Sequence, residues 1–133
     1  MAKTNKQRFE KFYCTVKGRA GHLLNNAKQR ARRYGLEYSI NYDWLKPKLE
    51  RGLCEVTGIP LVLKINGGKG HADNSFSPSL ERKDNALGYT QDNTQLVCWI
   101  YNRAKGAFPI TDLITLALAL ERRTPICPVS PAP

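Results

Sequence analysis

The stretch SPSLERKDNALGYTQDNTQLVCWIYNRAKG, residues 77–106, decides the fold of this chain. A short extended run ends in the charged cluster 81–84, and a Gly-Tyr turn follows it at 88–89. Residues 94–98 are predicted to form a second strand, and Asn102 stands one turn into the helix that comes next. The order strand, loop, strand, helix allows four polar side chains to converge on one divalent cation and a phosphate: Glu81, Arg82, Asp84 and Asn102.

The composition indicates one small folded domain with an anionic partner. The chain has 133 residues, 41% of them hydrophobic, which allows a modest core. Its formal net charge is +10, and residues 1–34 hold ten Lys or Arg against a single acid, Glu10. A basic segment on a near-neutral body favours a nucleic acid, DNA or else RNA, as the partner. The alternative is a charged segment that serves solubility.

Along the chain, the pattern predicts a basic arm of weak order at 1–17 and a single domain at 18–123. Gly35 should end a helix begun at residue 18, and Asn41 should cap another at 42–51. Leucine spacing predicts a last helix at 110–122. The remaining segments are a tight turn in 53–64, a Gly-rich surface loop at 65–77, and a Pro-rich tail at 124–133 that we expect to be disordered.

No apolar run approaches the ~20 residues that cross a bilayer, and the basic N-terminus is not a signal segment. We therefore expect a cytoplasmic protein with no membrane partner.

Five segments carry a resemblance to a known family: CEVTGIPL (54–61), PSLERKD (78–84), GYT (88–90), DNTQLVC (92–98) and NRAKG (102–106). Together they resemble the HNH endonucleases, and small phage-type members most closely. The resemblance implies an α+β fold with a ββα-metal core in residues 53–106, N-terminal helices before it and a C-terminal helix after it. It also implies an enzyme, an endonuclease that hydrolyses phosphodiester bonds in DNA with one Mg²⁺ or Mn²⁺.

The resemblance also implies residue roles. Glu81 and Arg82 stand where the family usually has a metal-binding Asp and a His base. Arginine stays protonated, so Arg82 is expected to clamp a phosphate instead. Asp84 is a further candidate metal ligand, and Asp84 and His71 are the alternative bases.

Two asparagines complete the implied site. Asn93 matches the middle family residue, whose side chain holds the loop between the strands. Asn102 matches the last position, a metal ligand through its amide oxygen. The residues expected to contact nucleic acid are Lys28, Arg30, Arg32, Arg33, Arg103 and Lys105.

Many HNH proteins carry two C-x-x-C zinc motifs, and this chain has half of each. Thr57 follows Cys54 and Tyr101 follows Cys98 at the third position. Because a structural zinc site needs four strong ligands, we expect no structural zinc. We expect Cys54 and Cys98 to be neighbours, as small buried hydrophobes.

Three functions remain open from the sequence. The first is a metal-dependent DNA endonuclease. The second is a non-catalytic nucleic-acid-binding protein on the same scaffold, which Arg82 favours. The third is a protein-interaction module that uses the apolar helix at 110–122 and the tail. The substrate form (duplex, junction or RNA), the sequence specificity, the base, the oligomeric state and the biological role stay open as well.

Overall fold

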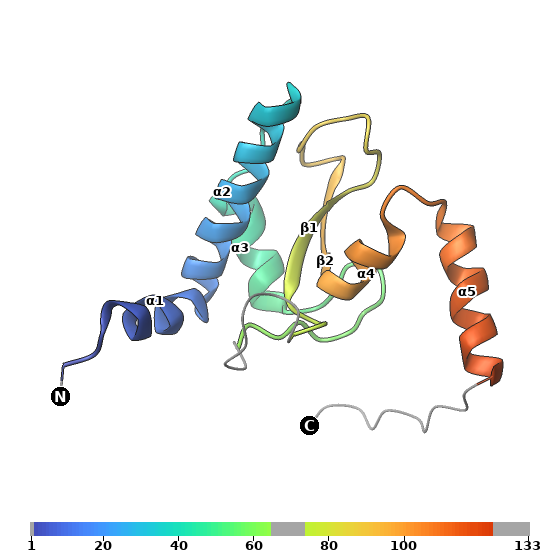
Figure 1. The fold of residues 1–133 in the computed structure, drawn as a ribbon. Coiled ribbons are helices and arrows are strands. Elements are labelled where there is room, and N and C mark those ends of the chain that lie inside the picture. Colours follow the sequence, from blue (N-terminus) through green and yellow to red (C-terminus); the bar gives the residue numbers. More distant parts are fainter. Residues whose placement is uncertain (1, 65–73, 124–133) are drawn as a thin grey trace.

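The computed structural model describes residues 2–64 and 74–123 and has an α+β fold (Figure 1). Three helices precede a two-stranded antiparallel sheet, and two helices follow it. The elements are α1 (Asn5–Tyr13), α2 (Val16–Tyr34), α3 (Tyr42–Arg51), β1 (Pro78–Arg82), β2 (Thr94–Cys98), α4 (Trp99–Lys105) and α5 (Ile110–Arg123). The predicted α+β class and the strand at 94–98 are confirmed.

Local chemistry explains where α2 ends and where α3 begins. Gly35 takes a left-handed conformation with φ of 63°, and the Leu36 N–H donates to the Ala31 carbonyl at 2.9 Å, which closes the last turn of α2. The Asn41 side chain accepts the Trp44 N–H at 3.0 Å and starts α3. The predicted helix at 42–51 is confirmed, and it tolerates Pro47.

The N-terminal segment differs from the weakly ordered arm predicted for 1–17. It forms α1, because Thr4 and Gln7 make a reciprocal capping box at its start. Tyr13 at the end of α1 is buried, and the Arg19 guanidinium lies 4.0 Å from the centre of its ring. The basic segment is therefore a helix that is packed against α2.

The hairpin separates two layers. β1 and β2 pair in antiparallel register, with Leu80 opposite Leu96 and Glu81 opposite Gln95. Because side chains alternate across a strand, Leu80 and Leu96 face the core with Leu45 of α3 and alanines of α2, while α4 packs on the opposite face (Figure 1). Burial of each core leucine stabilises the fold by roughly 1.5–3 kcal/mol.

A parallel bridge between Tyr38 and Tyr89 ties the chain after α2 to the loop between the strands. Gly88 passes so close to the Glu37 backbone that an added Cβ would lie 2.2 Å from the Glu37 carbonyl oxygen. Only glycine fits there, and this contact fixes the loop against the helical layer.

α5 is the least packed element, and none of its side chains is buried. In the part of the chain that is described, no helix is long and apolar enough to cross a membrane.

Candidate functional site

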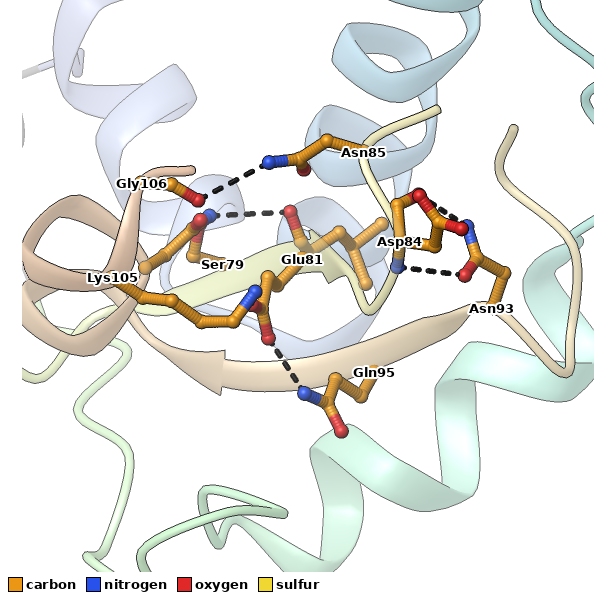
Figure 2. Close-up of polar contacts among 10 residues, drawn as sticks. Ser79, Glu81, Asp84, Asn85, Asn93, Gln95, Lys105 and Gly106 are labelled. Carbon is orange, nitrogen blue, oxygen red and sulfur yellow. Dashed lines mark hydrogen bonds and ion pairs between the residues drawn. The ribbon is translucent and has the colours of Figure 1, made fainter. Parts of the chain in front are cut away.

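The site lies between β1 and α4. Alternation along β1 directs Ser79 and Glu81 toward α4, and Leu80 and Arg82 toward the α2 layer. Figure 2 shows Glu81 between Gln95 of the neighbouring strand and Lys105 of α4. The consecutive residues Glu81 and Arg82 therefore act on opposite faces of the hairpin.

Glu81 is a buried carboxylate, only 4% exposed. The Gln95 side-chain amide donates to its Oε2 at 2.6 Å. Lys105 Nζ lies 2.5 Å from its Oε1 and forms an ion pair with it. A buried anion of this kind requires a cation beside it, and here the ammonium group of Lys105 supplies the charge.

Asn102 is fixed to β1 next to Glu81. Its amide nitrogen donates to Ser79 Oγ at 2.8 Å and to the Leu80 carbonyl at 3.3 Å. These bonds leave the amide oxygen, Oδ1, without a donor from the described residues. Glu81 and Asn102, two of the three predicted metal ligands, therefore lie along one β1–α4 contact.

Arg82 does not lie at the Glu81 carboxylate, contrary to the predicted convergence. Its guanidinium donates to the carbonyls of Asn85 and Leu87, at 2.9 and 3.0 Å, and lies 5.3 Å from the centre of the Tyr89 ring. The reason is the two-residue period of the strand. In this structure Nη1 of Arg82 holds the loop after β1, on the face of the hairpin opposite Glu81.

Asp84 is also separate from Glu81. It follows the end of β1 and is exposed, and its Oδ1 accepts the Ala86 N–H at 2.9 Å in a local turn. Figure 2 shows Asp84 beside Asn93, away from Glu81. Residues 2–64 and 74–123 contain no group of three or more His, Cys, Asp and Glu side chains that could hold a metal. His71, the other candidate base, lies outside the described residues.

Asn93 is the residue that organises the loop. Its side chain is buried, its Oδ1 accepts the Asp84 N–H at 2.9 Å, and its Nδ2 donates to the carbonyls of Asp84 and Gly88 at 3.0 and 2.9 Å (Figure 2). One amide thus satisfies three backbone groups across the loop between β1 and β2. This is the geometry that the resemblance implied for the middle asparagine.

The predicted nucleic-acid contacts divide into two groups. Lys28, Arg30, Arg32 and Arg33 are exposed on α2, and Arg103 is exposed on α4. Lys105 is different, because its side chain is only 13% exposed and turns inward to Glu81. Residues 102 and 105 share one face of α4, whereas 103 lies on another, so Lys105 belongs to the site and not to a surface with Arg103.

A groove lies between α2 and β1, next to the candidate site. It has a volume of about 130 Å³ and runs between α2 and β1, with His22, Asn26, Arg30, Ser79 and Trp99 among its lining residues. Arg30 Nη1 donates to the Tyr89 hydroxyl at 3.2 Å. The groove therefore extends from the exposed Arg30 to Ser79, which holds Asn102.

The two cysteine half-motifs do meet, as the sequence predicts. Cys54 and Cys98 are buried in one cluster with Val97. Burial opposes ionisation of the Cys54 thiol, but hydrogen bonds from Thr57 and neighbouring backbone groups lower its pKa. Burial raises the pKa of the Cys98 thiol. Burial and the nearby Glu81 carboxylate also raise the pKa of Tyr101, which keeps its phenol protonated.

Two residues have structural roles that the sequence pattern does not predict: Gln95 and Arg19. Gln95 is the hydrogen-bond partner of Glu81, and the antiparallel register that places it opposite was the available signal. Arg19 was counted with the basic surface, yet it is buried and donates to Ser77 Oγ at 3.3 Å and the Leu63 carbonyl at 2.6 Å. Burial lowers the pKa of this guanidinium. Nothing in its sequence context distinguished Arg19 from the exposed arginines.

Comparison with known proteins gives one relative. The chain is similar to the uncharacterized 29.0 kDa protein in the dda-modA intergenic region of Enterobacteria phage T4, with 28% identity over 99 residues. That match covers 74% of this chain and 35% of the phage protein, so the chain spans about a third of its relative. No family model matches the chain, and no solved structure matches it.

Proposed function

We propose that this protein is a metal-dependent endonuclease with an HNH-type ββα site, which hydrolyses phosphodiester bonds in DNA at the β1–α4 contact. The observation that supports this most is the buried Glu81 carboxylate, held by Gln95 and Lys105, which lies beside an asparagine amide fixed to the same strand.

The donor set suits Mg²⁺ or Mn²⁺. Glu81 provides a carboxylate and Asn102 an amide oxygen, and Mg²⁺ sites in proteins commonly use one or two such groups and keep several waters. When bound, such a cation would supply Lewis-acid stabilisation of the charge that develops on a phosphate. Lys105 would have to leave Glu81 Oε1, which its flexible side chain allows.

The chain's own residues would prepare this site. The Ser79 side chain and the Leu80 carbonyl orient the Asn102 amide, and Gln95 orients Glu81. Asn93 and Arg82 hold the loop after β1 from two sides. Arg30 at the groove, with the exposed Arg32 and Arg33 on the same helix, would bind backbone phosphates without reading sequence.

One observation favours a second function, a non-catalytic nucleic-acid-binding protein on the same scaffold. Arg82 stands at the position of the family's base and is engaged with loop carbonyls, and Lys105 already neutralises Glu81. Such a protein would bind DNA through α1 and α2 and leave it intact.

Nicking of supercoiled plasmid by the full-length chain separates the two functions. The endonuclease should convert plasmid to the open-circle form with Mg²⁺ or Mn²⁺ and should leave it unchanged in EDTA. Retarded mobility without any nicking in either metal would support the binding function and contradict the proposal.

DNA affinity should depend on α1. Four basic residues on and just before α1 are exposed: Lys3, Lys6, Arg8 and Lys11. Tyr13 is buried against Arg19, so replacing the four by Gln removes charge without unpacking the helix. If all four contact phosphates, the slope of log affinity against log salt should become shallower by roughly 3 to 4 units. Fluorescence anisotropy with duplex DNA measures this slope.

Lys46→Gln with Arg51→Gln on α3 is the control for that experiment, because both residues are exposed and lie on another helix. The control should change the slope little. An equal change in both proteins, or no change in either, would mean that α1 does not lie on the DNA.

A further inference from the structure

The helix α5 carries an apolar surface that no described residue covers. Six large apolar side chains on and just before this helix are between 41% and 66% exposed: Phe108, Ile110, Ile114, Leu116, Leu118 and Leu120. Figure 1 shows α5 beside the body of the protein and joined to it through α4. A 14-residue helix is marginal in water without packing of its apolar face, so this face needs a partner.

Part of this apolar surface is centred on Ala117, and Leu116 and Leu118 flank that part about a quarter-turn away on either side. At the helical period, Leu113, Leu120, Ile110 and Ile114 surround Ala117 on one side of α5, and Thr115 and Ala119 lie on the opposite side. Ala117 is also near the middle of Ile110–Arg123. A small residue at the centre of such a face allows two helices to approach closely.

We propose that α5 is a dimerisation helix, which packs antiparallel against α5 of a second copy of this chain, with the two-fold axis at Ala117. In that arrangement Ile114 of one chain lies opposite Leu120 of the other, and each contact occurs twice, as a closed two-fold interface requires. This inference does not depend on the proposed nuclease activity.

The charge of α5 allows contact with a second copy and argues against a nucleic acid on this face. The chain has a net charge of +10, but α5 is neutral, with Asp112 and Glu121 balancing Arg122 and Arg123. Contact through α5 therefore avoids bringing the basic helices α1 and α2 together. The face has no Lys or Arg before residue 122, which argues against nucleic acid on this surface.

The charges also select the antiparallel direction. Glu121 lies at the C-terminal end of the apolar face, where its own helix dipole is unfavourable. In an antiparallel pair it approaches the N-terminal turn of the other helix, whose free N–H groups favour an anion. In a parallel pair the two Glu121 side chains would meet and repel each other.

Sedimentation equilibrium of the full-length chain, from low to high micromolar concentration, tests this proposal. The wild type should approach twice its monomer mass of 15.0 kDa and dissociate on dilution. Ala117→Glu places two like charges against each other at the axis and should weaken the dimer by more than about 100-fold. Ala119→Glu, the same change on the opposite face, should leave it unchanged.

Circular dichroism should show equal helix content in both variants, because glutamate is a good helix former. A wild-type monomer at every concentration would overturn the proposal. So would a dimer that survives Ala117→Glu, an equal loss in both variants, or assembly beyond two chains.

Discussion

Replacing Lys105 by methionine should lower the free energy of unfolding by about 3 kcal/mol when no divalent cation is present. Methionine keeps much of the length of the side chain but removes the ammonium group 2.5 Å from Glu81 Oε1. Glu81 is 4% exposed, so its carboxylate would stay buried without a counter-charge. Urea denaturation in EDTA measures the loss.

Two further variants test that interpretation of Lys105. Arg103→Met on the same helix removes an exposed charge and should cost less than about 0.5 kcal/mol. Glu81→Gln combined with Lys105→Met removes both charges and should recover most of the stability. A loss below about 1 kcal/mol in Lys105→Met would mean that water reaches the carboxylate and that the pair is not a buried one.

The same variant reports on metal binding without an activity assay. With Lys105 absent, a cation that binds Glu81 and Asn102 should stabilise the fold, by about 2.7 kcal/mol at 100 times its dissociation constant. Mn²⁺ should therefore raise the unfolding midpoint of Lys105→Met and should have little effect on the double variant. An equal effect on both would place the cation elsewhere.

The Asn93→Ala variant should lose about 3 kcal/mol of stability. The substitution removes an amide that is 7% exposed and that bonds the Asp84 N–H and the carbonyls of Asp84 and Gly88. Each buried backbone group left without a hydrogen-bond partner lowers the stability of the fold by about 1–3 kcal/mol. The loss is smaller where water enters the loop and replaces the missing bond. The loop that carries Asp84 should then lose its fixed position relative to β1.

Asn85→Ala is the matched control for Asn93, since Asn85 lies in the same loop, is exposed, and donates a single bond to the Gly106 carbonyl at 3.2 Å. It should cost less than about 1 kcal/mol. Equal losses in the two variants, measured by thermal and urea denaturation, would mean that Asn93 does not organise the loop.

Local signals allowed much of the fold to be predicted. Gly35 and Asn41 mark helix boundaries through backbone conformation and capping, which depend on a few adjacent residues. The strand at 94–98 follows from its apolar residues and the turn before it. The capping box of Thr4 and Gln7 was also readable, but the density of positive charge led to the prediction of a weakly ordered arm.

The site was harder to predict, because it depends on which way each side chain turns. The motif at 81–84 suggested convergence, whereas the strand period separates Glu81 from Arg82 and the chain leaves β1 before Asp84. The inward turn of Lys105 follows from its spacing to Asn102 on α4. The burial of Arg19 required the tertiary contacts with Tyr13, Leu63 and Ser77, which no local pattern encodes.

The most direct test of the proposed activity is the nicking rate of Asn102→Ala beside that of Asn85→Ala, at saturating Mn²⁺ and supercoiled plasmid. Both substitutions remove an asparagine amide near the hairpin, but only Asn102 would contribute an oxygen to the cation. We predict that Asn102→Ala is at least about 100-fold slower than the wild type and that Asn85→Ala is close to it. Nicking by Asn102→Ala at the wild-type rate, in protein shown to be folded, would contradict the assignment of the site.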